Sequence, residues 1–154
     1  MKIVMTLVMV YDDQKILLGL KKRRFGVGRW YGFGGKVEGD ETIEEVVRRE
    51  LMEEVCISPK DLTPRGQLIF TFEENDDELE VHLFSVHEFS GEPQETEEMK
   101  PQWFLHSEIP YEQMWSDDPY WIPQFLAGKN IKGKVHFDSP ESQRILTNSI
   151  EAYD

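Results

Sequence analysis

Short blocks of apolar and polar residues alternate along this 154-residue chain, and they predict more strands than helices. Residues 3–11 and 15–20 are rich in Val, Leu and Met and flank a polar turn, which predicts a β-hairpin. Further extended segments are predicted at 30–33, 66–73, 80–89, 102–105, 134–137 and 144–152. The last of these is alternatively helical, and residues 120–126, followed by Gly128, predict a short helix.

Residues 42–55 carry the pattern of an amphipathic helix. Thr42 and Glu45 have the spacing of a capping box, in which each side chain covers an unpaired backbone N–H of the first turn. At roughly 100° per residue, one stripe of this helix runs through Ile43, Val46, Val47, Glu50, Glu53 and Glu54. The side that faces the core therefore changes from apolar to acidic halfway along the helix.

Clustered glutamates usually lie on a solvated helix face, but that explanation fits poorly here because Glu50 and Glu54 continue the apolar stripe. Carboxylates held near a core repel one another and lose hydration, so they need a cation. Mg²⁺ prefers such oxygen ligands together with substrate phosphates. A loop with Gly34, Gly35 and Lys36 precedes the helix and allows close approach of a ligand. The sequence thus indicates metal-dependent phosphate chemistry.

The spacing of these residues resembles the Nudix box, G-x5-E-x7-R-E-U-x-E-E-x-G-U, where U is apolar. The matching positions are Gly35, Glu41, Arg49, Glu50, Leu51, Glu53, Glu54 and Ile57. Cys56 stands where the box has its last glycine. That position lies at the helix end, where left-handed backbone is common, so we expect Cys56 to be a tolerated departure.

Composition narrows the class of protein. The net charge of −13 and the isoelectric point near 4.7 disfavour binding to a nucleic-acid polymer. The basic run 21–24 lies just before the glycine loop and either meets an anionic substrate or is a plain loop charge run. A single cysteine excludes a disulfide within the chain and fits a reducing compartment. Residues 1–10 are too short for a membrane span and lack a cleavage site, so we expect a soluble, cytoplasmic monomer.

The length fits one domain over residues 1–154, and strands with helices between them predict a mixed sheet covered by helices. The resemblance to the Nudix family implies the same fold class, α/β (α+β), as an α/β/α sandwich with a mixed β-sheet. The segments GRWYGFGGKVEGDETIE, EMKPQWF and MWSDDPYWIPQFL are similar to one Nudix subfamily, the eukaryotic-type MutT homologues. These enzymes hydrolyse oxidised purine nucleoside triphosphates and so remove damaged nucleotides from the pool.

This resemblance implies a substrate site. In the subfamily, the acids that match Asp117 and Asp118 read the purine edge, and the residue that matches Trp115 stacks on the base. Further positions expected to line the nucleotide site are Thr6, Lys21, Phe25, Tyr31, Phe33, Gly34, Gly35, Lys36, Phe70, Phe72, Met99 and Trp121. Each aromatic residue alone is more often core, and an Asp-Asp pair alone is more often a turn or a cap. Tyr31 departs from the subfamily, which has asparagine there.

Two adjacent carboxyls in an aromatic pocket do not both stay ionised, so one is expected to carry a proton. The pair then offers a donor and acceptors to the edge of an oxidised purine.

The resemblance further implies Mg²⁺, with Mn²⁺ as the alternative, and a small nucleotide as the substrate. The expected metal ligands are Gly34, through its carbonyl, and Glu50, Glu53, Glu54 and Glu98. Catalytic roles are expected for Glu53, Glu54 and Glu98, with Glu53 or Glu98 as the base. Two alternatives stay open: another Nudix substrate, such as a dinucleoside polyphosphate, a nucleotide sugar or a capped RNA end, and a catalytically silent nucleotide-binding module.

Overall fold

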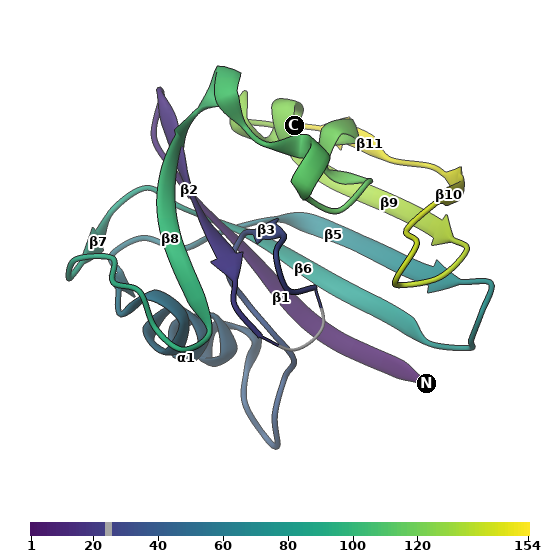
Figure 1. Cartoon of the computed structure of the whole chain (residues 1–154), viewed down its shortest axis with the longest axis horizontal. Helices are drawn as coiled ribbons and strands as arrows, with labels where there is room; N and C mark the ends of the chain where they lie inside the picture. Colours follow the sequence, from purple (N-terminus) through teal and green to yellow (C-terminus); the bar gives the residue numbers. More distant parts are fainter. Residues whose placement is uncertain (24–25) are drawn as a thin grey trace.

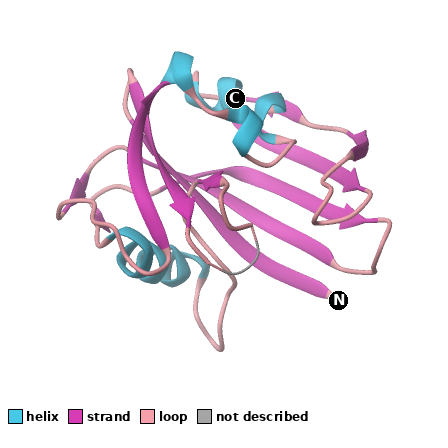
Figure 2. Ribbon diagram, viewed as in Figure 1, coloured by secondary structure: helices cyan, strands magenta, loops and turns pink. Residues whose placement is uncertain are grey.

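A mixed β-sheet with helices on both faces forms the protein (Figures 1 and 2). The computed structural model describes residues 1–23 and 26–154. Its strands are β1 (Lys2–Tyr11), β2 (Lys15–Lys21), β3 (Trp30–Tyr31), β4 (Ser58–Pro59), β5 (Thr63–Phe72), β6 (Glu78–Val86), β7 (Phe89–Ser90), β8 (Met99–Leu105), β9 (Asn130–Phe137), β10 (Ile145–Asn148) and β11 (Glu151–Tyr153). Its α-helices are α1 (Ile43–Val55) and α2 (Ile122–Leu126), and 3₁₀ turns span His106–Glu108, Tyr111–Gln113 and Asp118–Tyr120.

The strand order of the large sheet is β10-β9-β5-β6-β1-β2-β3, with β11 also paired to β9 and β8 to β2. The pairs β1–β6 and β5–β9 are parallel, whereas β1–β2, β2–β8 and β5–β6 are antiparallel. The mixed sheet that the sequence predicts is therefore confirmed. The small second sheet joins β4 to β7.

Strands β1 and β2 pair only next to their connecting turn, at Val10↔Leu17 and Tyr11↔Ile16. Beyond this point they diverge, and β2 pairs along its whole length with β8. The segment after β3 enters the opening and bridges β1 through Phe33 and Lys36. This divergence brings the glycine loop beside the middle of β1.

Side chains of β1 alternate between two hydrophobic cores, as the two-residue period of a strand requires. Val8 and Val10 belong to the core under α1, and Met9 and Tyr11 belong to the core under α2. Figure 1 shows α1 below the sheet and α2 with its 3₁₀ turns above it. The α/β/α sandwich is thereby confirmed. None of the helices in the described part of the chain has the length and apolar run that crossing a membrane requires.

The caps of α1 are the ones that its sequence predicts. Glu45 N–H donates to the Thr42 hydroxyl, and Thr42 N–H donates to the Glu45 carboxylate, at 3.2 and 3.0 Å. Cys56 ends the helix in the left-handed region, with φ of 64°. A Cβ in that conformation costs about 1 kcal/mol relative to glycine, so the departure from the Nudix box is accommodated in the backbone.

Several strand predictions differ from the structure. Strand β5 begins at Thr63 and not at 66, β6 ends at Val86 and not at 89, and β9 begins at Asn130 and not at 134. Strand β8 begins at Met99, three residues before the predicted 102, because its partner β2 continues as far as Lys21. The segment 144–152 is not helical but forms β10 and β11, which both pair with β9. In each case the partner strand, and not the local pattern, sets the structure.

Candidate active site

The acidic end of α1 lies against the glycine loop. Glu54 is buried, and its Oε1 accepts a hydrogen bond from Gly34 N–H at 2.9 Å. Burial raises the pKa of the Glu54 carboxyl well above its ordinary value; the Gly34 N–H lowers it, and Glu50 raises it further. A buried carboxyl with a raised pKa and a charged neighbour is typical of functional sites.

Both glycines of the loop are needed for this close approach. A Cβ on Gly34, whose φ is 149°, would lie 2.0 Å from the carbonyl oxygen of Thr6. A Cβ on Gly35 would lie 2.5 Å from Oε1 of Glu50. Gly35 N–H also donates to the Thr6 hydroxyl at 3.4 Å. At Gly34 the backbone of β1 therefore leaves no room for a Cβ, whereas at Gly35 a Cβ would displace the Glu50 carboxylate.

The neighbours of Gly34 indicate that its carbonyl points away from β1. The neighbouring carbonyls, of Phe33 and Gly35, accept hydrogen bonds from the N–H groups of Val8 and Thr6 in β1. Successive carbonyls of an extended segment alternate in direction. The orientation of the Gly34 carbonyl is thus compatible with its expected role as a ligand.

Arg49 forms ion pairs with three other acids of the Nudix-box segment. Its guanidinium contacts Glu41 at 2.7 Å, Glu50 at 2.8 Å and Glu53 at 3.3 Å. Glu50 is half-buried, and burial raises its pKa while the charge of Arg49 lowers it. Glu53 is 55% exposed and lies outside the buried stripe on which the sequence placed it.

Glu98, the expected acid outside the helix, lies at the start of β8. Arg23 contacts its Oε1 through both Nε, at 3.1 Å, and Nη2. Glu98 and Glu50 both add to the raised pKa of Glu54, whereas the charge of Lys21 lowers it. The structure therefore brings Glu98 and Lys21 within electrostatic range of the buried end of α1.

These residues fit a divalent cation by their chemistry. The donors are carboxylate and carbonyl oxygens, which hard cations prefer, and a cation would relieve the repulsion between Glu50 and Glu54. Within residues 1–23 and 26–154, no three acidic, histidine or cysteine side chains are grouped closely enough to hold an ion as they stand. Glu50 and Glu53 face Arg49, and Glu98 faces Arg23. Their role as ligands stays a prediction that requires these side chains to turn.

An aromatic pocket lies on the opposite face of the sheet. The rings of Phe70 and Trp115 are stacked, 5.8 Å apart and 12° from parallel. Phe137 meets both rings edge-on and also stacks with Phe72 at 5.8 Å. Trp115 is the partly exposed member of this group, so its ring is accessible to a base.

Asp117 and Asp118 are buried beneath these rings. Trp121 is also buried, and its indole N–H donates to Asp117 at 2.9 Å, so it positions this acid. Burial raises the pKa of Asp117 to about 6. The pKa of Asp118 is also raised well above its ordinary value, by burial and then by the charge of Asp117. Burial thus raises the pKa of both carboxyls, which is the direction that the expected proton on the pair requires.

Tyr31 connects the two halves of the site. It is half-buried; its pKa is raised by burial and lowered by a hydrogen bond with the Trp115 side chain, and the charge of Asp118 raises it. Lys21 Nζ lies 5.5 Å from the centre of the Tyr31 ring. Tyr31 thus faces the aromatic pocket and does not point away from it.

The remaining expected residues fall into three groups. Phe33 and Met99 belong to the core under α1, where Met99 packs over Gly19. The Lys36 carbonyl accepts a hydrogen bond from Arg49. Phe25 lies outside the described residues.

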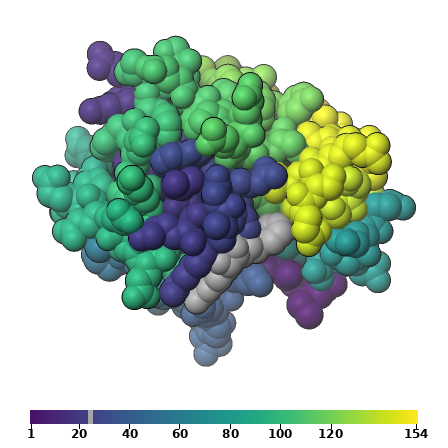
Figure 3. Space-filling view, viewed as in Figure 1, coloured from purple at the N-terminus to yellow at the C-terminus, as the bar shows by residue number. Residues whose placement is uncertain are grey.

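Some residues that contact the aromatic pocket lie outside the sequence motifs, and the sequence did not predict them. Arg29 donates to the Met114 carbonyl at 3.0 Å and to Gln143 at 3.3 Å, and Gln143 is buried with φ of 55°. In Figure 3 the segment around β3 (dark blue) lies between the residues before α2 (green) and the C-terminal residues (yellow). Tyr111, whose pKa is raised to about 12 by burial and by Asp118, was also missed. The unusual feature of Gln143 is its positive φ, and the backbone conformation of a single non-glycine residue cannot be inferred from the sequence.

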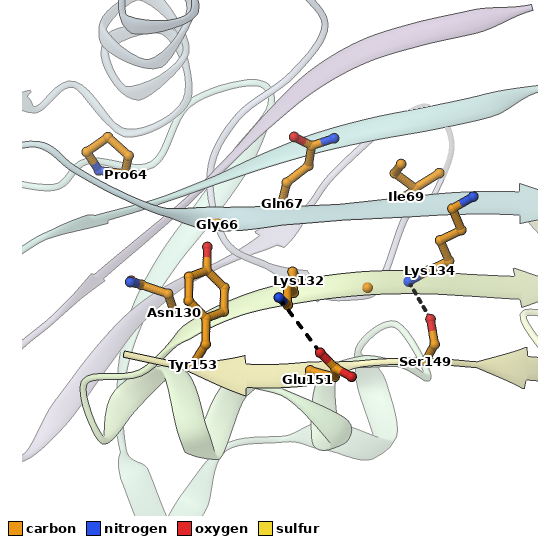
Figure 4. Close-up of a pocket in the computed structure, with 11 residues that line it drawn as sticks. Pro64, Gly66, Gln67, Ile69, Asn130, Lys132, Lys134, Ser149, Glu151 and Tyr153 are labelled. Atoms are coloured by element: carbon orange, nitrogen blue, oxygen red, sulfur yellow. Dashed lines mark hydrogen bonds and ion pairs between the residues drawn. The ribbon is translucent and has the colours of Figure 1, made fainter.

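A pocket of about 740 Å³ lies elsewhere on the sheet (Figure 4). It is formed by side chains of β5, β9 and β11, including Gln67, Lys132 and Tyr153. Lys132 contacts Glu151 at 3.9 Å and lies over the Tyr153 ring. No residue expected for catalysis or base recognition lines this pocket.

Comparisons with known proteins agree with this geometry. A model of the NUDIX domain matches residues 1–125. The oxidized purine nucleoside triphosphate hydrolase of Mus musculus is 45% identical over 149 residues, which cover 97% of this chain and 94% of that protein. The protein of the same name from Danio rerio is 45% identical over 133 residues, 86% of this chain and 85% of that protein. A MutT protein structure from Bacillus halodurans matches with a TM-score of 0.84 at 27% identity, covering 97% of each chain.

Proposed function

Because the chain belongs to the Nudix family, we propose that it hydrolyses oxidised purine nucleoside triphosphates to the nucleoside monophosphate and pyrophosphate. One observation carries the proposal: the adjacent, buried acids Asp117 and Asp118 have raised pKa values and closely follow Trp115, which stacks on Phe70. Such a reaction removes damaged nucleotides from the pool. The single cysteine and the acidic charge support action in the cytoplasm as a monomer.

The acid pair supplies base recognition. We expect one carboxyl of the pair to carry a proton and donate, and the other to accept; the Trp121 indole holds Asp117 in place. An oxidised purine exchanges donors and acceptors on its edge, so a site that offers both kinds of group selects for it. A base that leaves these buried groups unpaired is rejected strongly. The Trp115 ring stacks on the base and fixes its plane.

Phosphate chemistry belongs to the loop and the helix. Mg²⁺ held by the carboxylates would neutralise the phosphate charge and lower the pKa of a bound water. The Gly34 N–H donates to the Glu54 carboxylate, and the Thr6 hydroxyl accepts from the Gly35 N–H, so these hydrogen bonds hold Glu54 and the glycine loop beside each other. Glu98 or Glu53 then accepts the proton from the attacking water. Lys21 lies close enough to Glu54 to meet the triphosphate.

A substrate panel at fixed Mg²⁺ tests the proposal. Triphosphates of oxidised guanine, oxidised adenine, guanine and adenine are compared with a dinucleoside polyphosphate and a nucleotide sugar. We expect the highest kcat/KM for an oxidised purine, with pyrophosphate and monophosphate as products. Preference for either of the last two substrates would assign the chain to another Nudix reaction, and absence of turnover would make it a binding module.

A further inference from the structure

The loop between β9 and β10 holds Gln143 in an unusual backbone conformation. Gln143 has φ of 55°, in the left-handed region that a residue with a Cβ rarely adopts, and it is 3% exposed. Its N–H donates to the Ser139 carbonyl at 2.9 Å. Asp138 closes the same loop, because its carboxylate accepts from the Arg144 N–H at 2.9 Å and from the Ser142 hydroxyl at 2.7 Å. Strained backbone of this kind persists where the surrounding structure fixes it.

Gln143 joins this loop to the segment before α2. Its Oε1 accepts hydrogen bonds from Arg29 Nη1 and from the Ser116 N–H, each at 3.3 Å. Its backbone carbonyl accepts a third hydrogen bond, from the Ser116 hydroxyl. Arg29 also donates to the Met114 carbonyl at 3.0 Å. Gln143 and Arg29 together therefore bind both chain neighbours of Trp115.

Residues 114–117 depend on such contacts for their placement. They lie between two 3₁₀ turns, and in the described part of the chain they belong to no helix or strand. Ser116 separates Trp115 from Asp117. Contacts that hold Ser116 in place therefore hold both the ring that stacks on the base and the first acid of the pair.

We propose that Gln143 is a positioning residue for base recognition, an inference that rests on the proposed function. It acts through Ser116, which it holds so that the stacking ring and the acid pair keep their places relative to β3. Arg29 completes the link, because it directly precedes β3, and Tyr31 at the end of that strand bonds with the Trp115 side chain. A pocket that is ordered before binding pays less entropy when the base enters. Loss of Gln143 should therefore affect binding of the base more than the chemical step.

Gln143→Met removes both hydrogen bonds of Oε1 and keeps most of the volume, because methionine is of similar size and lacks the amide oxygen. We expect the KM for the preferred purine triphosphate to rise about tenfold, as on loss of a hydrogen bond from a charged donor. The kcat should stay near the wild-type value, because the lost contacts lie outside α1 and the glycine loop. Gln143→Glu keeps an acceptor oxygen toward Arg29 and Ser116 and should restore the KM. Gln113→Met, at an exposed position in the preceding 3₁₀ turn, is the matched control and keeps the wild-type KM.

Hydrogen exchange of backbone amides measures the positioning without a substrate. The Ser116 N–H donates to Gln143 Oε1 at 3.3 Å, and the Asp118 N–H donates to the Trp115 carbonyl at 3.1 Å. In Gln143→Met both amides should exchange about tenfold faster, whereas the amides of α1 should keep their rates. Ser116→Ala, which removes the hydroxyl bound to the Gln143 carbonyl, is a milder second variant and should change KM and exchange in the same direction.

Three results would overturn the proposal: unchanged exchange at residues 116 and 118, an unchanged KM despite faster exchange, or equal acceleration in α1, which would mean a general loss of stability. The proposed function is tested separately, by the wild type on the substrate panel. If the wild type prefers another base, the proposed function fails and KM is compared on that base. If it binds a nucleotide without turnover, Kd takes the place of KM. Either comparison still decides the role of Gln143.

Discussion

At the scale of single residues, the site depends on carboxyls that the fold has removed from water. Glu54 and Asp117 are both buried, and both have raised pKa values because burial disfavours the charged form. They differ in their surroundings: a backbone N–H and other acids for Glu54, an indole N–H and a second aspartate for Asp117. Their substitutions therefore have different consequences.

Glu54→Gln is expected to lower the rate of pyrophosphate release by about 10² or more, because it removes a charge at the phosphate site. The amide keeps the size of the side chain and its oxygen still accepts from Gly34 N–H, so circular dichroism should show an unchanged fold. Glu44→Gln, at an exposed position in the first turn of α1, serves as the control and keeps full activity. Near-normal turnover of Glu54→Gln would remove this residue from the catalytic centre.

Asp117→Asn is expected to stabilise the protein at neutral pH while impairing base recognition. Since the pKa of Asp117 rises to about 6 on folding, the folded state binds more protons than the unfolded state between about pH 4 and pH 6. The free energy of unfolding then falls as pH rises through this window, by on the order of 3 kcal/mol. Asn does not ionise, so Asp117→Asn does not lose this stability. Its free energy of unfolding should exceed that of the wild type at pH 7 and equal it near pH 4. Urea unfolding at both pH values measures it, and a pH-independent difference would contradict the assignment.

Tyr31→Asn is expected to change the ranking of purine substrates. The Tyr31 side chain has one hydroxyl, which bonds with Trp115 and lies near Asp118, whereas an amide donates and accepts through separate groups. Its ring adds stacking surface, and stacking discriminates weakly compared with hydrogen bonding. The wild type should therefore be the broader enzyme, with better use of methylated purines. Identical kcat/KM rankings of the two proteins on oxidised, methylated and plain triphosphates would refute this role.

At the scale of elements, α1 couples stability to the site because its last turn carries both Glu54 and the left-handed Cys56. Cys56→Gly is expected to raise the free energy of unfolding by about 1 kcal/mol, since glycine adopts positive φ without steric cost. Cys56→Ala retains the Cβ and removes the thiol, so it reports any loss of packing by itself. Thermal unfolding of both variants gives the difference. If glycine is no more stable than alanine, the backbone at this position is not strained.

At the scale of the whole molecule, the phosphate site and the base pocket use residues from opposite faces of the sheet, with Tyr31 between them. Thr6 and Glu54 lie on the side of α1, and Phe70, Trp115 and Asp117 lie on the side of α2. Sites without shared partners contribute additively to stability. The unfolding free energy of the double variant Glu54→Gln, Asp117→Asn should therefore equal the sum of the single effects within about 0.5 kcal/mol. A larger coupling would mean that the two halves act on each other through the sheet.

Local spacing in the sequence was sufficient for α1, its capping box, its left-handed end and the β1–β2 hairpin. Periodicity and capping act over a few residues, so the sequence contains them in full. The α/β/α architecture and the reaction class followed from the same local patterns and their resemblance to the Nudix box. The proton expected on the aspartate pair stays a prediction, and the structure adds that both carboxyls are buried and that burial raises both pKa values.

Contacts between distant segments were decided only by the tertiary structure. The length of β8 depends on its partner β2. The position of Glu53 depends on its contact with Arg49, and that of Glu98 depends on its contact with Arg23, which is distant in sequence. The contacts of Gln143 with Arg29 and Ser116 likewise join separate loops. Each of these results from pairing residues that lie far apart in sequence, and a single sequence does not specify such pairs because no local period encodes them.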